Sequence, residues 1–392
     1  MGGFQDSQDE AARRVVLDSS MVGDLARDFF DPKSPAHQEA RALVDFLTSE
    51  TSAWIPTLSA MHVNEIAQHS DARVVEQRIA FLERLPRIAW LRNTEQNNES
   101  TSPYLGSVLD LIYGEGIAWR PGVTACILCA SLRDSTFFVA TDPSYLGDLV
   151  WSIAESRQRL GSLNQARRLA SVTYAIQREA THFTVGQVRT RMTRDPELIQ
   201  GRLHARFARM AERLHKTADP RALGSESLLA QQFAAMGGDT ARYLSATDRD
   251  PFTAWLASQG LDPSHVQDSD TVQDVADLAA FRARWAMICE TRLVALSSER
   301  AKALRPWMIP SARVDNLVRH YQIQTADRPS GSDLLDASIA PMALYADVVF
   351  VDKRTQDLLR RIRRAHPDLD SALCRIVRWS VPAKALAALS KP

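Results

Sequence analysis

Short apolar runs alternate with helical segments near the start of the chain, and this alternation limits the possible folds more than any other feature. The first apolar run, Arg14 to Leu17, ends on Asp18 and leads directly into a helical pattern. Further strand-like runs occur at 53–55 and 88–91, with helical segments at about 35–47 and 58–69. Strands that alternate with helices of about 10 to 15 residues favour a parallel sheet covered by helices on both faces. We therefore predict an α/β fold.

The same pattern returns near the other end of the chain. Asp347 to Asp352 is a fully apolar run between two carboxylates, and 375–379 is a second, weaker strand-like run. The region between the two α/β segments opens with the polar stretch 93–103 and then shows mainly helical spacing.

This arrangement predicts one α/β domain that is split in the sequence. The domain comprises residues 12–92 and 306–392, and an all-helical insertion occupies 93–305. Such an insertion is tolerable because the entropic cost of closing a loop grows only slowly with its length. The alternative is two sequential domains that never meet.

Charge neither identifies nor excludes a nucleic-acid partner. Lys plus Arg and Asp plus Glu both number 47, so the basic excess of a simple nucleic-acid binder is absent. The charge is nevertheless segregated: 157–216 holds thirteen basic and four acidic residues, and 217–277 holds three and ten. Four arginines of the basic half are spaced to share one helix face: Arg202, Arg206, Arg209 and Arg213. Such a stripe either follows a phosphate backbone or pairs with the acidic half.

Several features favour a cytoplasmic protein that does not enter a membrane. No run of about 18 apolar residues, the length of a membrane-spanning helix, occurs in the chain. The N-terminus lacks the apolar core of a secretory signal. Four cysteines are too few for a disulfide scaffold.

Four acidic residues occupy positions that suit metal chemistry: Asp18, Glu65, Asp336 and Asp352. Asp18 and Asp352 each end a predicted strand, and open parallel sheets bind ligands beyond the carboxyl ends of their strands. Clustered carboxylates raise one another's pKa unless a cation neutralises them. Oxygen ligands of this kind suit Mg²⁺ or Mn²⁺, which can activate water and stabilise the leaving oxygen in phosphodiester cleavage.

Three segments together resemble PIN-domain nucleases: VVLDSS, WIPTLSAMHVNEI and DLLDASIAPMALYADVVFVDKR. The resemblance implies a three-layer α/β/α sandwich with a central, mainly parallel sheet. It implies that the catalytic residues and ligands of Mg²⁺ or Mn²⁺ are Asp18, Glu65, Asp336 and Asp352. It also implies endonucleolytic cleavage of single-stranded RNA that leaves a 5′-phosphate and a 3′-hydroxyl. Asp333 and Asp347 are rival ligands, because the spacing does not say which carboxylate faces the site.

Residues that follow the predicted strand ends are candidates for binding substrate phosphates. Ser19 follows Asp18, and Lys353 and Arg354 follow Asp352. For Ser19, capping of the next helix is an equally good interpretation. The basic run at 360–364 either grips phosphates or forms a solvated helix face.

Two other functions remain open from the sequence. The PIN-like core is catalytically silent in the first, and the insertion then serves as a scaffold for other proteins. In the second, the nuclease acts on structured DNA, as in the distantly related flap endonucleases. The toxicity of an unrestrained nuclease also favours a regulatory protein partner.

Overall fold

The chain forms two compact units. The computed structural model describes residues 12–49, 51–67, 69, 71–92, 106–140, 146, 147, 150, 151, 183–194, 250–258, 260–292, 303–325 and 337–391. The sheet unit comprises Met1–Gly161, Val294–Val318 and Leu335–Pro392, and the helical unit comprises Ser162–Leu293 and Arg319–Leu334.

A six-stranded sheet forms the centre of the sheet unit, with the order β4-β3-β2-β1-β5-β6. Its strands are β1 (Arg13–Leu17), β2 (Trp54–Leu58), β3 (Ile88–Leu91), β4 (Phe137–Ala140), β5 (Val348–Val351) and β6 (Arg375–Arg378). Every neighbouring pair is parallel except β3 and β4. The predicted α/β class with a mainly parallel sheet is therefore confirmed.

The pairing of β1 with β5 joins the two ends of the chain in one sheet. Val15 lies opposite Pro56 of β2 on one side and opposite Val348 of β5 on the other. This pairing excludes two sequential domains that never meet. It also creates a point where the strand order reverses, because β2 and β3 extend the sheet in one direction from β1 whereas β5 and β6 extend it in the other.

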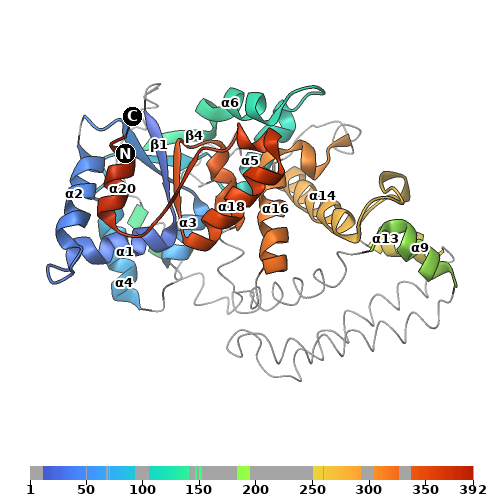
Figure 1. Cartoon of the computed structure of the whole chain (residues 1–392), viewed down its shortest axis with the longest axis horizontal. Coiled ribbons are helices and arrows are strands. Elements are labelled where there is room, and N and C mark those ends of the chain that lie inside the picture. Colours follow the sequence, from blue (N-terminus) through green and yellow to red (C-terminus); the bar gives the residue numbers. More distant parts are fainter. Residues whose placement is uncertain are drawn as a thin grey trace, which may run out of the picture. The chain divides into compact units, whose positions relative to one another are not determined.

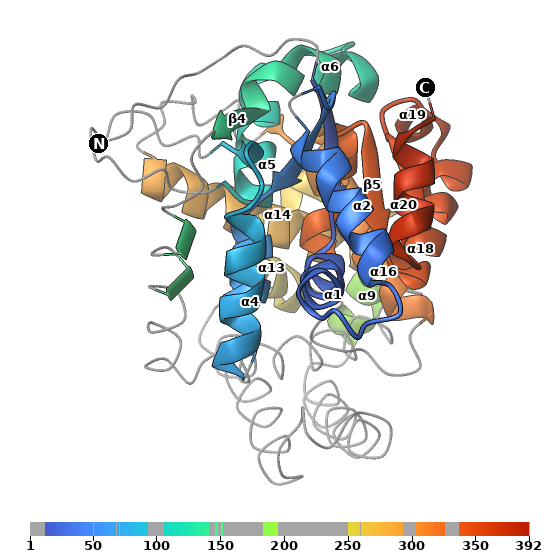
Figure 2. The same cartoon turned by 90° about the vertical axis from the view of Figure 1, so that its left-hand side faces the viewer.

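Helices cover both faces of this sheet (Figures 1 and 2). One layer holds α1 (Ser19–Phe30), α2 (His37–Thr48), α3 (Ala60–Ala67), α4 (Ala72–Leu82) and α20 (Pro382–Leu389), which share one hydrophobic core with the strands. The strands lie between α1, α2 and α20 on one side and α5 (Val108–Ala118) and α18 (Lys353–Ala365) on the other, as Figure 1 shows. Because both faces are covered, consecutive residues of β1 such as Val15, Val16 and Leu17 are all buried.

The described part of the sheet unit contains five further helical elements. They are α6 (Ala125–Thr136), the 3-10 turns η2 (Pro306–Met308) and η3 (Ala340–Leu344), α19 (Pro367–Asp370) and the start of α16 (Pro310–Thr325). Pro306 and Pro310 begin η2 and α16, where the missing proline N–H costs no intrahelical hydrogen bond.

The helical unit has a small core of its own. Its described elements are α9 (Val185–Arg194), α13 (Pro251–Ser258), η1 (Pro263–His265) and α14 (Val272–Arg292). Val185, Phe252 and Leu278 are among the buried residues of this core. The predicted arginine stripe at 202–213 lies outside the described residues. Among the residues that are described, no helix is long and apolar enough to cross a membrane.

The observed division of the chain differs from the predicted one, because the sheet unit continues beyond residue 92 and resumes before residue 306, at Val294. Strand β4 lies inside the region predicted to be all-helical, and it pairs with β3 in antiparallel register, Ala89 opposite Val139. The sheet unit accordingly extends to Gly161 rather than ending at residue 92. The expectation failed because β4 is only four residues long and follows α6 without a turn, so its strand character depends on the free edge of β3.

Candidate active site

Asp18 and Asp352 lie at the carboxyl ends of the two adjacent strands where the strand order reverses. Leu17 pairs with Phe350, and the backbone N–H of Asp18 donates to the Phe350 carbonyl oxygen at 3.3 Å. Both aspartates are also helix N-caps. The Asp18 carboxylate accepts from the Ser20 N–H at 3.4 Å, and the Asp352 carboxylate accepts from the Thr355 N–H at 2.6 Å. This edge is where open α/β sheets bind their ligands.

The Asp18 carboxyl group is held in an unfavourable environment for a negative charge. Asp18 is only 7% exposed. Burial, the largest cause, together with the charges of Glu65 and Asp352 raises its pKa to about 6. Hydrogen bonding to Ser20 opposes these effects. Three of the four predicted carboxylates are therefore near enough to interact electrostatically.

Glu65 reaches this edge from α3, the helix that follows β2. Because β2 is the parallel neighbour of β1, the helix after it begins at the same edge as Asp18. Glu65 is half-buried. Its charge also acts on Arg78 of α4, whose pKa is lowered by burial and raised by Glu65 and Asp24. A half-buried cation thus stands beside the carboxylates.

Arg78 was not predicted from the sequence. A Cβ at Gly23 of α1 would lie 2.6 Å from Nη2 of Arg78, so the guanidinium group fits against α1 at the position of a glycine. The only sequence signal is a glycine in the middle of a helix, which generally costs about 0.5–1 kcal/mol relative to alanine. That signal does not identify the partner, because Gly23 and Arg78 are 55 positions apart in the sequence.

His62 fixes the turn between β2 and α3 through Ser59. It is fully buried on α3, and its Nδ1 accepts from the Ser59 N–H at 3.0 Å. This bond assigns the ring proton to Nε2, which has no hydrogen-bond partner among the described residues. The Leu17 backbone acts to raise the pKa of His62. Burial outweighs this effect and lowers the pKa to about 4. His62 is therefore a neutral positioning residue one helical turn from Glu65.

The fourth predicted ligand, Asp336, and its rival Asp333 lie outside the described residues. The other rival, Asp347, is at the wrong edge of the sheet. It precedes β5, and its Oδ2 accepts from the Arg14 N–H at 2.7 Å and pairs with Arg133 at 2.6 Å. These bonds clamp the amino end of β5 to β1 and α6, so Asp347 is not a member of the carboxylate site.

The carboxylates match the chemistry of a hard cation, but their described members alone do not complete a metal site. Asp18, Glu65 and Asp352 offer only oxygen ligands, as Mg²⁺ and Mn²⁺ prefer. A cation would also relieve the repulsion that raises the Asp18 pKa. Among the described residues, however, no three His, Cys, Asp or Glu side chains form a group that could hold a metal ion.

The three predicted substrate-binding residues differ in their access to solvent. Lys353 is exposed and Arg354 is half-buried at the first two positions of α18. Ser19 is 3% exposed, and its buried hydroxyl has no hydrogen-bond partner among the described residues. The Ser19 hydroxyl is thus inaccessible to solvent, whereas Lys353 is open to a ligand.

A second buried acidic group lies in another part of the sheet unit. Glu115 of α5 accepts from the Ser311 N–H at 2.8 Å, from the Ser311 hydroxyl at 2.6 Å and from the Tyr345 hydroxyl at 2.5 Å. Burial raises its pKa to about 7 even though these three donors favour the charged form. The carboxyl group thereby links α5, the start of α16 and the segment before β5.

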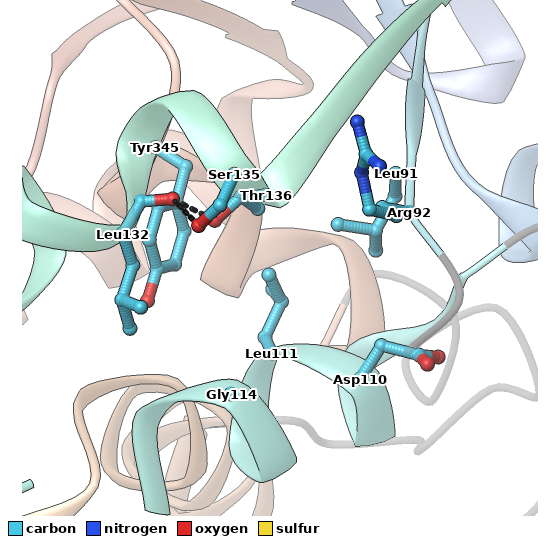
Figure 3. Close-up of a pocket in the computed structure, with 9 residues that line it drawn as sticks. All are labelled: Leu91, Arg92, Asp110, Leu111, Gly114, Leu132, Ser135, Thr136 and Tyr345. Atoms are coloured by element: carbon cyan, nitrogen blue, oxygen red, sulfur yellow. Dashed lines mark hydrogen bonds between the residues drawn. The ribbon is translucent and has the colours of Figure 1, made fainter. Parts of the chain in front are cut away.

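A small pocket adjoins this junction on the Tyr345 side (Figure 3). Its volume is about 50 Å³, room for a few water molecules and too little for a nucleotide. Ser135 and Thr136 in its wall donate their hydroxyls to the Leu132 carbonyl, at 3.0 and 2.6 Å, as the dashed lines show. The pocket is therefore not a candidate substrate site.

Comparison with known proteins adds no relative. No protein-family model matches the chain, and no curated protein or solved structure matches it either. The chemistry of the site has to be judged from its own residues.

Proposed function

We propose that this protein is a PIN-like, Mg²⁺- or Mn²⁺-dependent endonuclease that hydrolyses phosphodiester bonds in single-stranded RNA. One observation carries the proposal: Asp18 and Asp352 end adjacent parallel strands at the reversal of strand order, and Glu65 is close enough to raise the Asp18 pKa. Carboxylates gathered in this way are costly to the fold, which is typical of a functional site. The sheet order is also compatible with the three-layer sandwich that the PIN resemblance implies.

Each residue has a distinct part in the proposed reaction. Asp18, Glu65 and Asp352, together with Asp336, would hold the cation, which supplies an activated water and neutralises charge on the cleaved phosphate. Lys353 and Arg354 would bind the phosphate oxygens from the start of α18. Arg78 balances the charge of Glu65 from the protein side, and His62 fixes the turn between β2 and α3 through Ser59.

The test is cleavage of a 5′-labelled single-stranded RNA in Mn²⁺ by variants that keep the fold. We expect Asp18→Asn and Asp352→Asn each to lose at least about a hundredfold in rate, because each variant lacks a carboxylate that would hold the cation, and the cation would neutralise the negative charge that develops on the phosphate. Asparagine is as good a helix N-cap as aspartate, so both helices keep their caps. Asp71→Asn is the matched control, since Asp71 caps α4 through the Arg73 N–H at 2.9 Å and is exposed.

The outcomes separate the proposal from its rivals. RNA cleavage at the wild-type rate by both Asp18→Asn and Asp352→Asn would reject the assignment of the carboxylates. If unlabelled structured DNA inhibits cleavage of the labelled RNA more strongly than unlabelled RNA does, the substrate is DNA and not RNA.

A catalytically silent scaffold is the second candidate function. The observation in its favour is that the described carboxylates do not form a metal-holding group by themselves. A wild-type protein that binds no Mn²⁺ and cleaves neither RNA nor DNA would favour this function.

A further inference from the structure

Helix α18 carries a row of basic side chains that begins beside the carboxylate site. The helix starts directly after Asp352 and buries Leu358, Leu359 and Ile362. Its opposite face exposes Lys353, Arg360 and Arg364, which we call the α18 stripe. At 100° per residue, positions 353, 360 and 364 lie within about 40° of one another around the helix axis. Asp357 is the one acidic residue within this row.

Within the part of the chain that the structure describes, no carboxylate forms an ion pair with the stripe, and Asp357 alone leaves its three basic residues with a net positive charge. Asp368 and Asp370 of α19 are the nearest carboxylates in sequence after the stripe, and both are engaged elsewhere. Asp368 pairs with Arg313, and Asp370 pairs with Arg363 at 2.7 Å. The three stripe residues form no hydrogen bond or ion pair with any described residue.

Helix stability does not account for the stripe either. Lys353 occupies the first turn of α18, where the helix dipole disfavours a cation, and that turn has no acidic residue. Arg360 and Arg364 are like charges four residues apart, which costs a helix a few tenths of a kcal/mol, and Asp357, three residues before Arg360, offsets only part of this repulsion. Only Arg364, in the last turn, is favoured by the dipole. The stripe therefore adds little to the stability of α18, and its positive charge is better explained by binding of an anionic ligand.

We propose that the α18 stripe is a track for the phosphate backbone of single-stranded RNA that leads away from the scissile phosphate. The proposal rests on the proposed function and extends it to the flanking nucleotides. From Lys353 to Arg364 the helix rises about 16 Å, enough for several nucleotides beyond the carboxylate site. Arginine and lysine contacts to phosphate are independent of base sequence, so the track sets a length requirement and not a sequence requirement.

The first test measures RNA binding without cleavage. A fluorescein-labelled 12-nucleotide RNA is titrated in EDTA with the wild type and with Arg360→Ala/Arg364→Ala, at several salt concentrations. Loss of two phosphate contacts reduces the slope of log K against log salt by about 1.4, at 0.7 per contact. At about 0.1 M salt this corresponds to roughly ten- to thirtyfold weaker binding.

A control variant removes the same net charge from another surface. Arg41 of α2 and Lys384 of α20 are exposed, and both helices belong to the layer on the other side of the sheet from α18. We expect Arg41→Ala/Lys384→Ala to bind the RNA with nearly wild-type affinity. Wild-type affinity in the stripe variant, or an equal loss in the control, overturns the track.

A second measurement separates failure of the track from failure of the proposed function. Hydrolysis of bis(p-nitrophenyl) phosphate in Mn²⁺ needs the carboxylates. This diester is too small to reach Arg360 from the carboxylate site. We expect the stripe variant to keep the wild-type rate on this diester and to lose rate on the 12-nucleotide RNA. If the wild type hydrolyses the diester and the stripe variant cleaves RNA at the wild-type rate, the track is rejected and the proposed function is not. Undiminished diester hydrolysis by Asp352→Asn rejects the proposed function.

Discussion

Asp18 costs the fold free energy at neutral pH, because its pKa in the folded protein, about 6, lies above the unfolded value of 3.8. The contribution of this group to stability is fully present below the unfolded pKa and is lost as pH rises toward 6. Asn has no charge to bury and still caps α1. We expect Asp18→Asn to unfold like the wild type at pH 4 and to be more stable at pH 8, by up to about 3 kcal/mol. Urea unfolding without divalent ions checks this, and a variant less stable than wild type at pH 8 contradicts it.

His62 has the opposite pH dependence. Its pKa is lowered to about 4 from 6.5, so its contribution to stability is present above pH 6.5 and is lost as pH falls through 4. His62→Phe keeps the volume but leaves the buried Ser59 N–H without its acceptor, at a cost of about 1–3 kcal/mol at pH 7. This cost should shrink at pH 4.5, where the wild type has lost part of its own stabilisation. Equal unfolding midpoints of variant and wild type at pH 7 would show that the bond to Ser59 contributes nothing.

Glu115 acts between elements, because its carboxyl group joins α5, the start of α16 and the segment before β5. Its raised pKa of about 7 means that the wild type loses stability as pH rises from about 4.5 to 7. We expect Glu115→Gln to remove this slope and Glu115→Ala to cost about 2–4 kcal/mol throughout, since Ser311 and Tyr345 then lack an acceptor. Guanidinium unfolding of the three proteins between pH 5 and 8 distinguishes these effects. A slope that survives in Glu115→Gln would have to come from another group.

The elements themselves differ in how far local sequence specifies them. The apolar runs of β1, β3 and β5 are visible in the sequence, because each strand is buried on both faces and reads as continuous hydrophobic residues. Strand β4 follows α6 directly and owes its conformation to pairing with β3. No local pattern predicts β4, because its hydrogen-bond partner β3 is some 50 residues away.

For the molecule as a whole, the proposed function predicts that a cation stabilises the folded state through the carboxylates. A ligand present at a hundred times its dissociation constant stabilises by about 2.7 kcal/mol. We expect millimolar Mn²⁺ to raise the thermal unfolding midpoint of the wild type and of Asp71→Asn, but not that of Asp352→Asn. An equal shift in all three proteins would place the cation elsewhere, and no shift in any would favour the scaffold.

Local patterns in the chain were sufficient to locate the strands that end on Asp18 and Asp352 and the helix that carries Glu65. The apolar composition of a short run and the capping of the next helix are local features of neighbouring residues. Folding in three dimensions decided the rest: the position of Asp347 at the opposite edge, the fit of Arg78 against Gly23, and the raised pKa of Asp18. Each of these depends on side chains that are distant in sequence, and their mutual placement exists only once the sheet has formed.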